Sequence, residues 1–296
     1  MTDASTFYHF PSPAKLNLFL HIVGQRSDGY HELETVFQFL ELSDTISIRT
    51  TDNQGIELLT PIDGVSNDDN LIVKAAKLLQ ESTQTNYGAQ IKIDKILPMG
   101  GGLGGGSSNA ATILIALNTL WKTKLTHSQL AELGIQLGAD VPIFIHGYAA
   151  FAQGIGEKLT PVQPKEYFYL VTKPNCSIST QAIFTANDLT RNTAKLDLCS
   201  QTLNSHELNA LIENSHNDCQ TLVIKHYPEV ANLLAWLIEY APSRMTGTGA
   251  CIFTRFDSEE EANRVAKKLP ATIEFFVTKG VNQSPLHRFL KLEKLD

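Results

Sequence analysis

The sequence has few cysteines, no excess of basic residues and no long apolar run. Its four cysteines stand apart, and none forms a C-x-x-C pair. Zinc sites and thioredoxin-like redox chemistry are therefore not expected. Instead, we expect reduced thiols in a cytoplasmic protein. No apolar run approaches the roughly 20 residues of a membrane span. The first residues lack the charged and apolar regions of a signal peptide, so no membrane partner is expected.

The charge balance is acidic, which bears on the kind of partner. Lysine and arginine number 24 against 31 acidic residues, for a net charge of −7 in 296 residues. Without a basic stripe, nucleic acid is not the expected partner. A locally positive site in an acidic protein can still bind phosphate. Hydrophobic residues make up 43%, so one large or two ordinary domains are expected.

A glycine-rich stretch at 98–111 is the feature around which the chain is organised. All residues from Gly100 to Gly106 except Leu103 are glycine, and a polar Ser107-Ser108-Asn109 and an apolar run to Trp121 follow. Glycine permits positive φ and close approach to a ligand. Serine and asparagine are favoured N-caps. The pattern predicts a loop that opens a helix whose N-terminus faces a phosphate.

Several familiar phosphate loops do not fit this stretch. Gly106 is followed by serine, so the Gly-Lys-Ser/Thr ending of a P-loop is missing. The G-x-G-x-x-G pattern is present, but the preceding segment alternates like a half-exposed antiparallel strand, and no acidic residue follows about 20 positions later. Protein-kinase signatures are also absent. A flexible linker is disfavoured, because a patterned strand and an apolar helix bracket the stretch.

The periodicity of the whole chain predicts an α+β protein with a domain boundary near 149–162. Asp68 or Asp69 is expected to cap the first helix, and Thr126 and Gln129 form a capping box before a helix that Gly138 ends. Residues 51–67 and 185–205 are turn-rich. Strands are predicted at 14–23, 30–40, 44–49, 89–96, within 149–162, and at 167–172, 250–256 and 273–279. Helices are predicted at 70–80, 108–121, 126–138, after Asp140, at 206–213, 217–226 and 229–240, and after Ser258.

Isolated polar residues within these elements are candidates for chemistry. Lys15 interrupts an apolar alternation, and in a strand it shares one face with Asn17. A solvated strand lysine is the alternative interpretation. Asp140 precedes Val141-Pro142, where it is either an ordinary helix cap or a proton acceptor for a hydroxyl. Tyr30-His31 suits stacking on a base and reading its edge, although such a pair also occurs as core and surface residues.

Three segments taken together resemble the motifs of the GHMP kinases, which phosphorylate small-molecule hydroxyls or carboxylates. They are Pro11–Asn17, Pro98–Asn109 and Thr246–Ala250, in the same order and at similar spacing. The resemblance implies a two-lobed α+β fold. An ATP-binding domain with a mixed or antiparallel sheet is expected over 1–155, and a ferredoxin-like substrate domain over 156–296. The last strand, near 273–283, is expected to pack back on the first domain.

The resemblance also implies a catalytic and a cofactor site. Asp140 corresponds to the base, and Lys15 to the group that orients it and favours the ionised hydroxyl. ATP and Mg²⁺ are the expected cofactors, and the metal ligands stay open, with Ser107 or Ser108 as candidates. The expected ATP site comprises Pro98, Met99, Gly100, Gly101, Gly102, Leu103, Gly104, Gly105, Gly106, Ser107, Ser108, Asn70, Leu71 and Lys95.

Further segments, such as Asp28–His31 and Leu137–Pro142, resemble one branch of the family. Its substrate is a cytidine-diphosphate sugar alcohol, phosphorylated on a tertiary hydroxyl in the non-mevalonate route to isoprenoids. This implies a cytosine between two aromatic rings, with His31 at its edge. Alternatives are a mevalonate- or homoserine-type kinase and a non-catalytic nucleotide-binding module. A monomer or homodimer is expected. The expected substrate site comprises Asn17, Tyr30, His31, Thr180, Phe184, Thr246, Gly247, Thr248 and Gly249.

Overall fold

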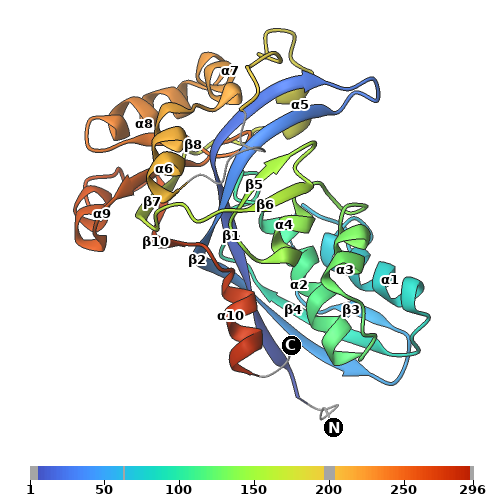
Figure 1. Cartoon of the computed structure of the whole chain (residues 1–296). Helices are drawn as coiled ribbons and strands as arrows, with labels where there is room; N and C mark the ends of the chain where they lie inside the picture. The colour runs from blue at the N-terminus through green and yellow to red at the C-terminus, as the bar shows by residue number, and fades with distance from the viewer. Residues whose placement is uncertain (1–5, 63, 197–203, 294–296) are drawn as a thin grey trace.

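A long antiparallel hairpin runs through the molecule, and both halves of the chain pack against it (Figure 1). The computed structural model describes residues 6–62, 64–196 and 204–293. β1 (Tyr8–Gln25) and β2 (His31–Thr51) pair from Tyr8–Ile48 to Gln25–His31. The strands predicted at 30–40 and 44–49 merge into β2, because the chain stays extended through a register shift, after which pairing with β1 resumes at Ser43.

The strands form a sheet in the order β3-β4-β2-β10-β7-β9-β8, with β1 and β5 on β2 and β6 on β5. β10 lies between the two parts of this sheet. It pairs with β2 at Gly280 and Val281 and with β7 over the rest of its length. The remaining strands are β3 (Ile56–Leu58), β4 (Gly88–Asp94), β5 (Ala150–Gln153), β6 (Lys158–Pro161), β7 (Phe168–Lys173), β8 (Ser243–Met245), β9 (Ile252–Phe256) and β10 (Glu274–Val281).

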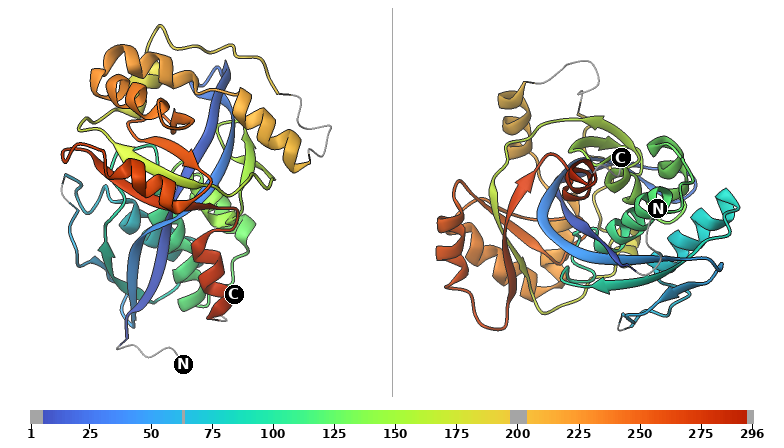
Figure 2. Two further views of the ribbon diagram at one scale, coloured as in Figure 1. Left: turned by 90° about the vertical axis from the view of Figure 1, so that its left-hand side faces the viewer. Right: turned by 90° about the horizontal axis from the view of Figure 1, so that it is seen from below.

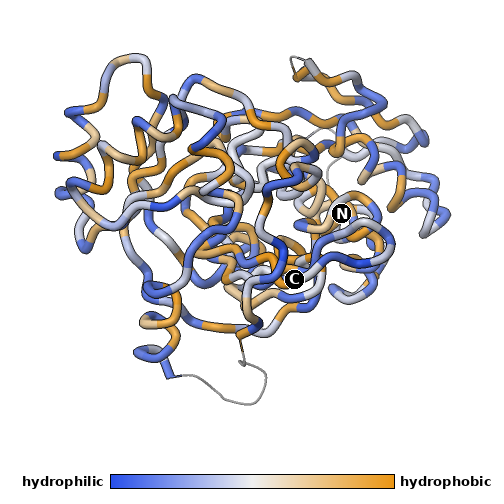
Figure 3. Tube along the Cα trace, turned by 90° about the horizontal axis from the view of Figure 1, so that it is seen from above, coloured by the Kyte–Doolittle hydropathy of each residue, from blue (hydrophilic) through white to orange (hydrophobic). Residues whose placement is uncertain are grey.

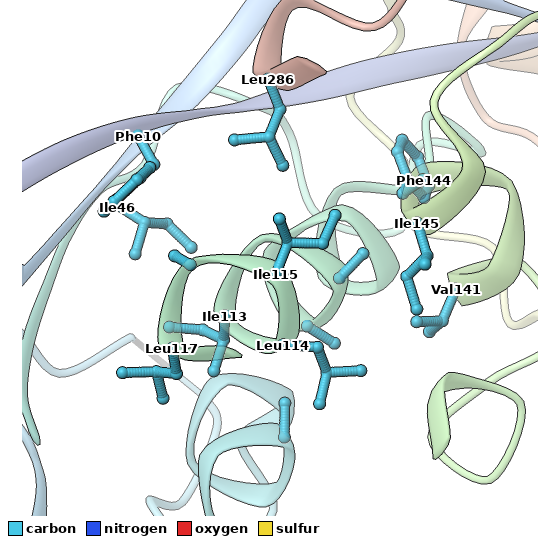
Figure 4. Packing of buried hydrophobic residues seen from close by; sticks show 14 of the residues in the cluster. Phe10, Ile46, Ile113, Leu114, Ile115, Leu117, Val141, Phe144, Ile145 and Leu286 are labelled. Carbon is cyan, nitrogen blue, oxygen red and sulfur yellow. The ribbon is translucent and has the colours of Figure 1, made fainter. Parts of the chain in front are cut away.

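One group of helices builds a core beside the first part of the sheet. Its central helix, α2, is buried on almost every side, as expected for a helix that is hydrophobic all round. Figure 4 shows Ile115 of α2 on the side of Phe10, Phe144 and Leu286, and Leu114 on the other side of the helix. The group comprises α1 (Leu71–Thr83), α2 (Gly105–Leu120), α3 (His127–Gly134), α4 (Val141–His146) and α10 (Pro285–Leu292).

The other group of helices lies at the opposite end of the hairpin, as the two views of Figure 2 show. Leu20 and Ile22 of β1 join its core, so the same strand contributes to the cores beside both groups of helices. The helices at the periphery alternate between hydrophilic and hydrophobic residues along the trace (Figure 3). The group comprises α5 (Thr180–Thr185), α6 (Ser205–Asn214), α7 (Asp218–His226), α8 (Pro228–Ile238) and α9 (Glu259–Ala266).

Some helix ends differ from the predictions. Asn70 caps α1 instead of Asp68 or Asp69, because its side chain accepts the hydrogen bond from the Ile72 amide. The capping box at Thr126 is confirmed, but α3 ends at Gly134, and turns lead on to Gly138. Sequence periodicity missed the short elements β3, β8 and α5 and the C-terminal helix α10. The predicted loop 185–205 lies partly outside the described residues.

Candidate active site

A cavity of about 620 Å³ opens where the glycine loop, the hairpin and the start of α4 meet. It gathers most residues predicted for the ATP and substrate sites. Ser108, Tyr30, His31, Thr246 and Gly249 are not part of its wall. The predicted residues in the wall are Lys15, Asn17, Asn70, Leu71, Lys95, Pro98, Met99, Gly100, Gly101, Gly102, Leu103, Gly104, Gly105, Gly106, Ser107, Asp140, Thr180, Phe184, Gly247 and Thr248.

The glycine loop needs glycine for its backbone shape. Gly100, Gly102 and Gly104 have φ values of 64°, 75° and 73°, a region that other residues adopt at a cost. A Cβ on Gly102 would lie 2.2 Å from the carbonyl oxygen of Thr246, so the loop packs directly on the second glycine turn.

Helix α2 begins earlier than predicted. Gly104 is its N-cap and makes no side-chain cap bond, so Ser107 and Ser108 lie within its first turn. The prediction that serine or asparagine caps this helix is wrong, because the amide of Ser108 already bonds to the carbonyl of Gly104 at 2.8 Å. The backbone N–H groups of residues 105–107 therefore form the N-terminus of α2, and these three residues line the cavity. Such amides have no partner within the helix and favour an anion.

A buried carboxylate that the sequence did not reveal fixes the entrance to the loop. Asp44, on β2, is fully buried. Its Oδ1 accepts hydrogen bonds from the amides of Ile96 and Leu97, each at 2.8 Å. Its Oδ2 accepts from Lys95 Nζ at 2.7 Å and from Asn109 Nδ2 at 3.0 Å. One side chain thus joins β2 to both ends of the loop.

Two polar side chains beside the loop differ in what they offer to a nucleotide. Ser108 is fully buried, and its hydroxyl lies 3.0 Å from that of Ser12, so it supports the loop from beneath. Asn70 lies at the cavity wall and caps α1 with its oxygen. Its amide nitrogen is buried and finds no hydrogen-bond partner in the part of the chain that the structure describes. An unsatisfied buried donor at this position fits an acceptor on a bound nucleotide.

Lys15 and Asp140 form an ion pair across the cavity. Lys15 Nζ lies 3.2 Å from Asp140 Oδ2, and the side chains are 3% and 35% exposed. The ammonium also donates to Asn17 Oδ1 at 2.6 Å and to the carbonyl of Gly102 at 3.2 Å. The interpretation of Lys15 as a solvated strand residue is therefore wrong. Asp140 occupies the N-cap position of α4, but its side chain makes no capping bond.

The second glycine turn connects the hairpin to the far wall of the cavity. The buried hydroxyl of Thr246 accepts a hydrogen bond from the Asn17 amide at 2.9 Å, so Thr246 supports the site from behind. Gly247 and Thr248 face the cavity itself. The hydroxyls of Thr248 and Thr180 lie 3.0 Å apart, which brings α5 to the same wall.

The residues predicted to hold a pyrimidine are only partly together. Phe184 lines the cavity, and the ring of His31 stacks on it with centroids 5.1 Å apart and planes 25° apart. Tyr30 lies at the hairpin end with 59% of its surface exposed. Arg191, which the sequence did not single out, donates from Nε to His31 Nε2 at 3.0 Å. Burial, and then the Arg191 charge, lower the pKa of His31.

Other classes of site find little support in the described residues. They contain no cluster of three or more His, Cys, Asp or Glu suited to a metal ion. Cys176, Cys219 and Cys251 are free thiols, and burial raises the pKa of Cys219 and of Cys251 to about 12, so both stay protonated. Cys199 lies outside the described residues. Within residues 6–62, 64–196 and 204–293, no helix has the length and apolarity needed to cross a membrane.

The chain belongs to the GHMP kinase family. The model of the GHMP kinase N-terminal domain matches residues 70–148, and that of the C-terminal domain matches residues 200–274. The family and the two-lobed α+β fold predicted from the sequence are thus confirmed.

Two curated relatives carry the same enzyme name, 4-diphosphocytidyl-2-C-methyl-D-erythritol kinase. The one from Colwellia psychrerythraea is 65% identical over 277 residues, or 94% of this chain and 91% of the relative. The one from Aliivibrio fischeri is 55% identical over 283 residues, or 95% of each. A crystal structure of 4-(cytidine 5′-diphospho)-2C-methyl-D-erythritol kinase aligns with a TM-score of 0.77 at 29% identity, over 92% of this chain and 99% of that one. A mevalonate kinase at 17% identity, with a TM-score of 0.67 over 93% of this chain and all of that one, shares the fold.

Proposed function

We propose that this chain transfers the γ-phosphate of ATP to the 2-hydroxyl of 4-diphosphocytidyl-2-C-methyl-D-erythritol, a step on the non-mevalonate route to isoprenoid precursors. The observation that carries the proposal is the ion pair of Lys15 and Asp140 beside the glycine loop. A nucleotide-binding module has no use for a carboxylate held next to a buried cation. The names of relatives 65% and 55% identical support this substrate among those of the family.

The arrangement of the chain's own residues suits phosphoryl transfer, which depends on positioning and charge stabilisation more than on covalent chemistry. Asp140 accepts the proton of the substrate hydroxyl as the oxygen attacks phosphorus. Lys15 is fixed by Asn17 and by the loop carbonyl of Gly102, so its charge lies where negative charge develops on that oxygen. The N-terminal amides of α2 bind the nucleotide phosphates.

The residues around the loop fit ATP bound as its Mg²⁺ complex. Asp140 supplies a carboxylate and Ser107 a hydroxyl at the cavity wall, whereas the Ser108 hydroxyl pairs with Ser12. Mg²⁺ in such enzymes uses one or two protein ligands and takes the rest from phosphates and water. Ser107 is therefore the proposed protein ligand, directly or through a water. When bound, the ion neutralises charge on the phosphates.

The proposal is tested by supplying MgATP with three acceptors in parallel: the cytidine-diphosphate methylerythritol, mevalonate and homoserine. ADP release is followed in a coupled assay, and phosphorus NMR identifies the new phosphomonoester. We expect turnover with the cytidine compound alone. Turnover with mevalonate or homoserine instead would make the chain a different GHMP kinase. ATP binding without turnover on any acceptor would make it a non-catalytic module.

A further inference from the structure

Three oxygen atoms surround the ammonium of Lys15, and one of them belongs to an amide that can turn. Nζ of Lys15 lies 2.6 Å from Oδ1 of Asn17, 3.2 Å from the carbonyl oxygen of Gly102 and 3.2 Å from Oδ2 of Asp140. The contact with Asn17 is the shortest. An amide group can present its oxygen or its NH2 group, and only the oxygen accepts a hydrogen bond from an ammonium. The orientation of the Asn17 amide therefore decides whether Lys15 keeps this contact.

The hydroxyl group of Thr35, on β2, lies on the other side of the Asn17 amide. It donates its hydrogen to the carbonyl of Phe19, and its oxygen lies 3.1 Å from Nδ2 of Asn17. A hydroxyl has a single hydrogen, so an oxygen whose hydrogen is bound to Phe19 can only accept. The group of Asn17 that faces Thr35 must then be the NH2 group, which leaves Oδ1 for Lys15. Thr35 and Asn17 are both buried, so bulk water does not replace these bonds.

An irregularity in β1 presents the Phe19 carbonyl to this hydroxyl. Asn17 pairs with Phe37 and Leu20 pairs with Thr35, so three steps along β1 match two steps along β2. The extra residue of such a bulge falls out of the regular ladder. Phe19 is one of the two residues that the pairing skips, and the Thr35 hydroxyl binds its carbonyl. The backbone of the hairpin therefore fixes the direction of the hydrogen bonds that lead to the Asn17 amide.

Building on the proposed function, we propose that Thr35 is a positioning residue for phosphoryl transfer: its hydroxyl fixes the Asn17 amide so that Oδ1 holds the Lys15 ammonium beside Asp140. Thr35 borders the cavity but acts through Asn17. Without the hydroxyl, the NH2 group of Asn17 loses its partner and the amide can turn. An NH2 group that faces the ammonium repels it, so Lys15 loses its shortest contact. The amides at the N-terminus of α2 are not part of this chain of bonds, so ATP affinity is kept.

The first test compares Thr35→Val with a matched control, Thr172→Val, by steady-state ADP release. Thr172 is also a buried strand threonine whose hydroxyl donates to a backbone carbonyl, that of Ile252, but it is not part of the cavity wall. We expect Thr35→Val to lower kcat by about three- to tenfold, the range of one hydrogen bond, with both KM values within about twofold. Thr172→Val should keep kcat, and Thr35→Ser, which retains the hydroxyl, should restore it. An unchanged kcat in Thr35→Val, or an equal loss in Thr172→Val, would overturn the inference.

The second test observes the Asn17 amide itself, by NMR of protein labelled with nitrogen-15 asparagine. The side-chain signals of Asn17 are assigned by their loss in Asn17→Asp. In the wild-type protein and in Thr172→Val, we expect the NH2 hydrogen that faces Thr35 to exchange slowly with solvent. In Thr35→Val, we expect its exchange to be at least about three- to tenfold faster, since its acceptor is gone. Equal exchange rates in the wild-type protein and Thr35→Val refute the inference.

A double variant separates action through Asn17 from direct action on the substrate. In the Asn17→Ala background, Thr35→Val should lower kcat no further, because the group through which Thr35 acts is already lost. A further loss contradicts the inference. If Thr35→Val does not fold, the wild-type spectrum decides, and fast exchange of both Asn17 NH2 hydrogens there refutes the inference. Slow exchange in a wild-type protein that turns over none of the three acceptors would overturn the proposed function and leave the hydrogen bond to Thr35 intact.

Discussion

Replacing Gly104 by alanine should impair catalysis by displacing Lys15. Gly104 caps α2 with φ 73°, and a Cβ there would lie 3.0 Å from Lys15 Cε and 2.9 Å from Phe144 Cζ. The Phe144 ring is buried in the core and has little room to move. The aliphatic part of Lys15 is therefore the group that yields, and its ammonium moves relative to Asp140.

The magnitude of the effect has two parts. A non-glycine residue in the left-handed region costs about 1–2 kcal/mol of stability. A displacement of the reacting groups by about 1 Å can cost about 10²-fold in rate. We thus expect kcat to fall by about 10²-fold. The free energy of unfolding should fall only by the backbone strain and by the close contacts of the new Cβ with Lys15 and Phe144.

The matched control for Gly104→Ala is Gly64→Ala. Gly64 has φ 78°, close to that of Gly104, but nothing lies within 4 Å of a Cβ built on it. Urea unfolding should show a loss of about 1–2 kcal/mol in the control, and steady-state ADP release should show the large loss of kcat in Gly104→Ala alone. A kcat for Gly104→Ala within twofold of that for Gly64→Ala would refute the reasoning about Lys15.

Three further predictions follow from the site and its surroundings. Asp140→Asn should fold and bind both substrates but lose about 10²–10⁴ in kcat; near-normal turnover would make Asp140 a structural residue only. Tyr30→Ala and Phe184→Ala should each weaken binding of the cytidine substrate by about 10–100-fold with ATP affinity kept, by the scale of base–aromatic stacking; unchanged calorimetric Kd values would contradict the stacking role. Burial, followed by the His216 charge, lowers the pKa of His21 below 6.5, so the unfolded chain takes up a proton that the folded one does not. The free energy of unfolding should therefore fall as the pH drops through 6.5, the ordinary pKa of histidine, and the urea midpoint of His21→Gln should depend less on pH; an equal slope would remove His21 as a cause.

The glycine run illustrates what the sequence can and cannot predict about local structure. Its composition predicts both the loop and the helix after it, because glycine adopts the positive φ values at positions 100, 102 and 104 at less cost than other residues. The start of α2 was misplaced by three residues, since serine and asparagine are stronger N-cap candidates than glycine in isolation. Here tertiary contacts decide: Asn109 and Ser108 bond to Asp44 and Ser12 and are not available as caps.

The residues of the candidate site likewise fall into those that the sequence analysis identified and those that it could not. Lys15 stood out because it is a lysine within an apolar strand, whereas Asp140 has the local sequence of an ordinary helix cap and was assigned as the base through the resemblance to the GHMP kinases. Asp44 and Arg191 could not be recognised, because their partners lie 51–65 and 160 positions away, and neither is unusual among its neighbours. The contacts that position a site are long-range, and one sequence carries no local signal for them.

The shape of the hairpin of β1 and β2 explains how residues far apart along it reach the same cavity. Lys15 pairs with Phe39, and Gln25, ten residues later, pairs with His31, a distance of about 33 Å for a straight strand. Register shifts between Pro13 and Lys15, Asn17 and Leu20, and Ile22 and Gly24 interrupt the pairing, and such bulges bend strands. Figure 1 shows the far end of the hairpin curving over toward α5. The bends therefore bring His31 back to Phe184 at the cavity, so the hairpin carries both Lys15 of the ion pair and His31, which the sequence predicts to recognise the base.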